Sequence, residues 1–109
     1  MAFHALEVSL ALVPSLKEPV AVIARTNADL ARQIRRAASS IALNVAEGRR
    51  RIGGDRFHLW RVAAGSAGEV VAALEAAVSW GDIGSSDIAE PLALLDRINA
   101  MLYKMTHKK

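Results

Sequence analysis

Apolar residues recur at helical spacing along almost the whole chain. Steps of three and four residues, rather than the alternation of a strand, relate the apolar positions in every stretch. Four such segments stand out, at about residues 2–24, 26–48, 54–80 and 87–105. Four amphipathic helices joined by short loops predict an all-α fold, an antiparallel up-and-down four-helix bundle, in a single domain over residues 1–109.

The first segment is apolar on two sides and contains two prolines. One stripe comprises Phe3, Leu6, Leu10 and Val13 and continues with Leu16, Val20 and Ile23, and a second stripe beside it comprises Ala5, Val8 and Leu12. A helix that is apolar over most of its circumference needs more than one partner surface. Pro14 and Pro19 each remove a backbone donor and crowd the preceding turn, so a kinked or broken first helix is expected.

Polar and glycine residues predict the limits of the second segment. Thr26 and Asp29 resemble a capping box at its start. Gly48 suits a left-handed C-cap at its end, and Gly53 with Gly54 forms the following turn. The apolar stripe between these limits comprises Leu30, Ile34, Ala37, Ile41 and Val45.

The third and fourth segments have the clearest stripes. The third begins near Gly54 or Asp55, ends near Trp80, and carries Phe57, Trp60, Ala64, Ala67, Val71, Leu74 and Val78 at heptad-like spacing. The fourth begins near Asp87, and Pro91 is tolerable there because it falls close to the helix start. Its stripe comprises Ile88, Leu92, Leu95, Ile98 or Asn99, Leu102 and Met105.

Composition narrows the chemistry that the bundle can support. The apolar share is 52% and the aromatic share 5%, so the core consists mainly of Ala, Val, Leu and Ile. The absence of cysteine excludes disulfides and thiolate chemistry and fits a reducing cytoplasm. The first residues lack a basic leader, and no apolar run approaches the roughly 18 residues of a membrane span. We therefore expect a cytoplasmic protein with no membrane partner.

Positive charge is concentrated in the middle of the chain. The net charge is +3, but residues 25–61 contain nine arginines and only three acidic residues. Arginine binds carboxylates and phosphates equally well, so the abundance alone does not choose between internal salt bridges and nucleic-acid binding.

A long motif in this basic region resembles a known family. The motif runs from Gln33 to Gly48 as QIRRAASSIALNVAEG, and AAGSAGE follows at residues 63–69. It is similar to the bacterial four-helix bundle family encoded in ribosomal RNA intervening sequences. The resemblance implies a homo-oligomer, a ring of five, with no known catalysis. A related group, the accessory proteins of diversity-generating retroelements, forms basic pentamers that bind nucleic acid and a reverse transcriptase. This chain departs from the pattern in its two first-segment prolines and at Ala64, where an arginine is common.

The motif residues first predict a structural joint. Small residues around Gly65 and Ser66 favour close packing of the second and third helices. Asn44 is expected to fix the register of these helices by hydrogen bonding. Salt bridges are predicted to join these helices, or neighbouring subunits, with Arg35 and Arg36 as the cations and Glu47 and Glu69 as the anions.

The arginines that this joint leaves exposed are the best functional candidates. They are Arg32, Arg36, Arg49, Arg50, Arg51 and Arg56. Repeated around a ring, they would create a positive field able to neutralise the phosphates of RNA or DNA without reading bases. The alternatives are a solvated face that complements the helix dipole, and a structural module whose ring binds a partner protein. Catalysis, cofactors and metals are not expected, because His4, His58 and His107 lie in no ligand spacing.

Overall fold

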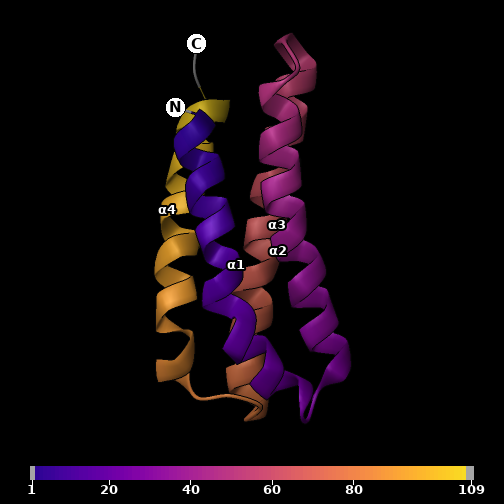
Figure 1. The fold of residues 1–109 in the computed structure, drawn as a ribbon, viewed down its shortest axis with the longest axis vertical. Helices are drawn as coiled ribbons and strands as arrows, with labels where there is room; N and C mark the ends of the chain where they lie inside the picture. The colour runs from indigo at the N-terminus through magenta and orange to yellow at the C-terminus, as the bar shows by residue number, and fades with distance from the viewer. Residues whose placement is uncertain (1, 108–109) are drawn as a thin grey trace.

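The computed structural model describes residues 2–107 as an antiparallel up-and-down four-helix bundle (Figure 1). Its helices are α1 (Ala2–Ala24), α2 (Ala28–Arg49), α3 (Gly53–Trp80) and α4 (Ala89–Thr106), with a short 3₁₀ helix, η1 (Ser85–Ile88), before α4. The bundle measures 43 × 21 × 20 Å, and the four helices share one apolar core. The predicted all-α fold class is confirmed.

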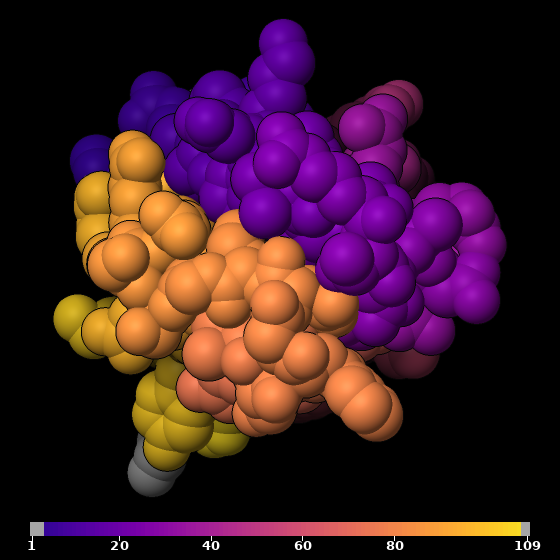
Figure 2. Space-filling model, turned by 90° about the horizontal axis from the view of Figure 1, so that it is seen from below, coloured from indigo at the N-terminus to yellow at the C-terminus, as the bar shows by residue number. Residues whose placement is uncertain are grey.

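The helices form a square in which α2 and α3 make the most extensive contact. The α2–α3 hairpin extends past the ends of α1 and α4 where the two termini lie (Figure 1). At the opposite end, the α1–α2 turn lies beside the α3–α4 connection (Figure 2). The projecting hairpin carries the arginine-rich sequence away from the rest of the bundle.

Before Pro14, the core buries only the Ala5, Val8 and Leu12 stripe of α1 completely, and Leu6 of the other stripe is half-buried against it. The buried residues of this helix include Ala5, Val8, Leu12, Leu16, Val20 and Ile23. Leu10 and Val13 of the other stripe are 53% and 47% exposed. The bundle therefore leaves a second apolar face of α1 without a partner inside the chain.

Helix α1 continues through both of its prolines, so of the predicted kink or break the break does not occur. Pro14 has no amide hydrogen to donate to the carbonyl of Leu10, four residues earlier. Both residues are exposed, so water can reach this part of the helix. Leu12, Leu16 and Val20 fix the turns on both sides of Pro14 by burying their side chains. Tertiary packing thus overrides the local cost of proline in the helix.

The substitution Pro14→Ala is expected to stabilise the fold by about 1–2 kcal/mol. Alanine restores an amide donor to the Leu10 carbonyl. Proline lowers the conformational entropy of the unfolded chain, and losing this effect costs less than the restored hydrogen bond gains. Urea denaturation measures the change. Pro19 is buried, so Pro19→Ala also removes packing and should stabilise less. A Pro14→Ala variant less stable than the parent would contradict this account of α1.

A side-chain network joins the two connections at the lower end of the bundle. The Thr26 hydroxyl donates to Asp82 Oδ1 at 2.6 Å, and Asn27 Nδ2 donates to Asp82 Oδ2 at 3.2 Å. The N-cap of α2 is Asn27, whose Oδ1 accepts from the Leu30 amide at 3.2 Å. The predicted capping box at Thr26 is therefore wrong, because Thr26 contacts the α3–α4 connection instead.

The helix-ending glycine is Gly81 rather than Gly48. Gly48 lies inside α2, which continues to Arg49 and is followed by Arg50 in a right-handed conformation. The predicted left-handed cap at Gly48 is therefore wrong. Gly81 has φ +83° and ends α3, with its amide bonded to the Val78 carbonyl at 3.0 Å. Gly53, with φ +62°, begins α3 and turns the chain back along α2.

Helix α3 meets the length and composition criteria of a membrane span, which the sequence did not suggest. Core helices of soluble bundles meet the same criteria. Only 33% of its most apolar 18-residue window is buried within the chain, and Glu69 and Glu75 lie on the helix. The exposed part of this window consists mainly of small residues and the two glutamates.

Candidate nucleic-acid interface

Three consecutive arginines occupy the end of the projecting hairpin. We call Arg49, Arg50 and Arg51 the tip arginines. They end α2 and begin the connection to α3, next to Ile52, which is 82% exposed. The Arg50 side chain is 80% exposed and that of Arg51 48% exposed. The tip therefore presents guanidinium groups to solvent beside one apolar side chain.

Acidic residues partly neutralise this group of cations. Arg51 Nη2 lies 2.9 Å from Glu47 Oε2, and its Nη1 lies 3.8 Å from Asp55 Oδ2. Arg50 Nη1 reaches Glu47 Oε1 only at 4.0 Å. Exposed pairs of this kind contribute about 0–1 kcal/mol each, so a phosphate can compete for the same guanidinium groups.

Arg56 has a structural role at the hairpin. Its Nε donates to the Gly48 carbonyl at 3.1 Å and its Nη2 donates to the Arg49 carbonyl at 3.0 Å. The guanidinium carbon lies 5.4 Å from the centre of the Trp60 ring. Arg56 thus satisfies two carbonyls at the C-terminus of α2, where a cation also complements the helix dipole.

Trp60 holds the base of the hairpin together. Its ring is 7% exposed, and its Nε1 donates to the Val45 carbonyl at 3.3 Å. A Cβ added to Gly48 would lie 2.6 Å from Trp60 Cδ1 and Nε1, closer than real contacts allow. Gly48 is therefore required because the Trp60 ring packs directly on the α2 backbone, a reason that the motif alone did not reveal.

The other two candidate arginines lie apart from the tip. Arg32 and Arg36 are exposed on the body of α2, and Arg32 forms an ion pair with Asp29. Arg36 precedes Arg50 by fourteen residues, or about 21 Å along the helix at 1.5 Å per residue. The structure thus brings four of the six candidates to the hairpin and leaves two on the side of the bundle.

The predicted salt bridges between α2 and α3 are not formed within the chain. Glu47 pairs with Arg50, three residues further on, and with Arg51, four residues further on, because both lie about one helical turn away. Among the described residues, Arg35, Arg36 and Glu69 are exposed and make no ion pair. The prediction of a charged joint between these helices is therefore wrong for a single chain.

A hydroxyl and amide cluster joins α2 to α3 instead. Asn44 Nδ2 donates to the Ser40 carbonyl at 2.9 Å and to Ser40 Oγ at 3.0 Å. The Ser66 hydroxyl donates to Ser40 Oγ at 2.9 Å. Asn44 does form hydrogen bonds, but only to Ser40 of its own helix, so its predicted role in fixing the register of the two helices stays a prediction. The bond between Ser66 and Ser40 is the one that crosses from α3 to α2, and Ser40 is a link that the sequence reasoning did not single out.

The glycines of α3 have no packing role inside the chain. Gly65 and Gly68 are exposed, and a Cβ added to either would meet no atom within 4 Å. The prediction that they permit close approach of α2 is therefore wrong. Since glycine costs about 1 kcal/mol relative to alanine within a helix, packing inside the chain does not explain these two glycines.

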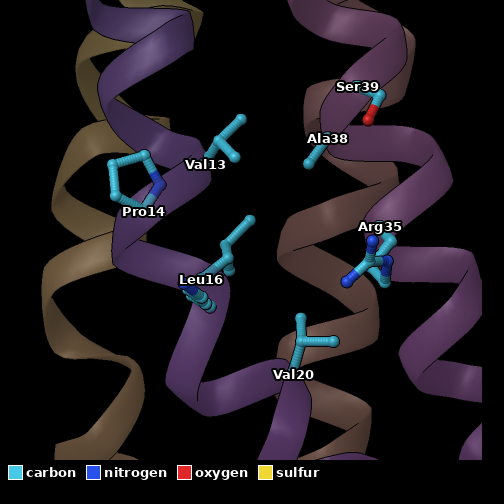
Figure 3. Close-up of a pocket in the computed structure, with 8 residues that line it drawn as sticks. Val13, Pro14, Leu16, Val20, Arg35, Ala38 and Ser39 are labelled. Atoms are coloured by element: carbon cyan, nitrogen blue, oxygen red, sulfur yellow. The ribbon is translucent and has the colours of Figure 1, made fainter.

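A groove of about 420 Å³ separates the middle of α1 from α2 (Figure 3). Val13, Leu16 and Val20 line it from α1, and Ala38 and Arg35 line it from α2 (Figure 3). Lys17 contributes a second cation from the α1 side. The apolar stripe of α1 was the signal for this feature, but the sequence did not show that the groove stays open.

The described residues contain no cluster of three or more His, Asp or Glu side chains that could hold a metal ion. The structure is thus a helical bundle with an arginine-bearing hairpin and an open groove. These features define a class of small basic four-helix bundle proteins.

The chain belongs to the 23S rRNA-intervening sequence protein family, whose model matches residues 16–104. This result confirms the resemblance carried by the central motif. A crystal structure of a protein of unknown function from the S23 ribosomal protein family of Bacteroides thetaiotaomicron is similar, with a TM-score of 0.85 and 18% identity over 95% of this chain and 99% of that chain. That similarity shows the fold. The comparison with curated proteins gave no match.

Proposed function

We propose that this chain is a non-catalytic, homo-oligomeric bundle that binds RNA or DNA through its tip arginines. The observation that supports the proposal most is the position of three consecutive arginines on a hairpin that projects from an elongated bundle (Figure 1). Arg56 and Trp60 brace this hairpin from behind, so the cations sit on a rigid support. In a ring of five, the expected assembly, the same group would recur in every subunit.

The chemistry of the tip favours phosphate contacts without base reading. Arginine forms two parallel hydrogen bonds with a phosphate, and the tip supplies a dense group of such donors. We expect binding that depends strongly on salt and little on sequence, because neutralised phosphates release their counterions. The competing carboxylates of Glu47 and Asp55 make the affinity of one copy modest, and repetition in an oligomer raises it.

Replacing all three tip arginines with glutamine tests this assignment. Fluorescence anisotropy with labelled single-stranded RNA and duplex DNA should show at least about a tenfold loss of affinity, and the salt slope should fall by about 3. The matched control is Arg25→Gln with Arg97→Gln and Lys104→Gln, which removes the same charge from exposed positions elsewhere. Equal losses in both triple variants, or none in the tip variant, would contradict the assignment.

A second candidate function is docking to a partner protein. Ile52, exposed beside the tip arginines, favours this alternative because apolar and arginine side chains together are typical of protein interfaces. The substitution Ile52→Ser separates the two functions. Nucleic-acid affinity should be unchanged in this variant if phosphate contacts dominate, whereas binding of a protein partner would weaken.

A further inference from the structure

The groove between α1 and α2 has an apolar floor and one unpaired cation on each wall. Val13, Leu16, Val20 and Ala38 supply the apolar surface. Lys17 projects from α1 and Arg35 from α2, and within residues 2–107 neither forms an ion pair. An occupant that complements this groove needs a narrow apolar ridge with an acidic group on each side.

The exposed face of α3 has that arrangement. Gly65, Gly68 and Ala72 follow one another along the helix at steps of three and four and are exposed. At 100° per residue, Glu69 and Glu75 fall on opposite sides of this line. Both glutamates are exposed, and neither forms an ion pair in the described part of the chain.

The other exposed helix faces fit the groove less well. That of α2 carries Arg32 and Arg36, and that of α4 carries Arg97 and Lys104 beside Glu90 and Asp96. These cations would be repelled by Lys17 and Arg35. After Arg61, which lies one turn before Gly65, α3 contains no lysine or arginine, and its exposed residues between 62 and 79 are small, apolar or acidic.

We propose that the α1–α2 groove receives helix α3 of a second copy of this chain. The small residues of α3 lie toward the groove floor, and Glu69 and Glu75 face the cations on the two walls. The two glycines then have a role, because the missing Cβ atoms let the α3 backbone approach α1 and α2. The proposal rests on the homo-oligomer of the proposed function and assigns its contact surfaces.

The two surfaces differ, so the contact is head-to-tail. Each copy offers one groove and one α3 face, and successive copies therefore form a closed ring when their rotation closes. The tip arginines take no part in the contact, so Arg50 and Arg51 stay exposed on every copy. Assembly and phosphate binding thus use separate residues, which can be changed independently.

A charge swap tests the pairing. The groove variant is Lys17→Glu with Arg35→Glu, and the α3 variant is Glu69→Lys with Glu75→Lys. Sedimentation velocity at micromolar concentration should show that each double variant associates at least about 100-fold more weakly than the parent, because like charges now face each other. The quadruple variant, with all four charges exchanged, should recover the parental mass. All four side chains are exposed, so circular dichroism should show the parental fold.

Each outcome of this experiment decides the inference. Parental mass in both double variants, or no recovery in the quadruple variant, would overturn the pairing while leaving a homo-oligomer and its nucleic-acid binding intact. A parental chain that is monomeric would overturn both the pairing and the homo-oligomer. A monomer that floats with phosphatidylcholine and phosphatidylglycerol vesicles would assign the uncovered α3 face to a lipid surface instead.

Discussion

Replacing Trp60 with alanine is expected to lower the free energy of unfolding by about 3–5 kcal/mol. The ring is buried, packs edge-on against Phe57 with 6.2 Å between centroids, and bonds the Val45 carbonyl. Its removal leaves a cavity at the base of the hairpin. The Val45 carbonyl also loses the hydrogen bond from Trp60 Nε1. It also frees the Arg56 guanidinium, which lies over the ring.

Urea denaturation monitored by circular dichroism measures this loss. The matched control is Trp80→Ala, because Trp80 is 78% exposed at the end of α3 and should change stability by less than about 0.5 kcal/mol. Similar losses at both tryptophans would show that the hairpin does not depend on Trp60 in the way described.

Replacing Gly48 with alanine is expected to cost about 1–3 kcal/mol, although alanine is the better helix former. The new Cβ would stand 2.6 Å from the Trp60 ring, and the ring cannot retreat without losing its bond to the Val45 carbonyl. Overpacking therefore outweighs helix propensity at this position.

The control for this substitution is Gly54→Ala, where an added Cβ meets nothing within 4 Å. That variant should be neutral or slightly more stable. In a Trp60→Ala background the cost of Gly48→Ala should also disappear, because the clashing ring is absent. A Gly48→Ala variant as stable as Gly54→Ala would refute the close contact.

Hydrophobic periodicity was sufficient to predict four helices because each helix buries a continuous stripe. Local rules predicted the helix ends less well. Gly48 looks like a cap, but it makes room for the Trp60 ring, twelve residues further on. Thr26 also looks like a cap, but its hydroxyl bonds Asp82 across the bundle. Proline rules suggested a break at Pro14, yet the buried turns around it keep α1 continuous.

The candidate site was predicted in part. The tip arginines lie together because they are consecutive in sequence, and Arg56 joins them because the hairpin folds it back onto α2. The pairing of Arg35 with Glu69 failed because motif spacing does not fix which way side chains on two helices face. Both side chains are exposed, which is what an interface between copies requires.

The separation between the tip and the groove gives the protein two independent surfaces. Arginines at the projecting end can contact phosphates while the side of the bundle contacts another copy. Oligomerisation would then raise the overall affinity for nucleic acid without any new kind of contact, since linked sites act at high effective concentration.

Native mass measurement with and without a short single-stranded RNA tests the central claim most directly. The account predicts a homo-oligomer that gains RNA mass at low salt, and a variant with all three tip arginines changed to glutamine that keeps the oligomeric mass and loses the RNA. A monomer that gains no RNA mass, or an oligomer whose RNA binding survives that variant unchanged, would contradict it.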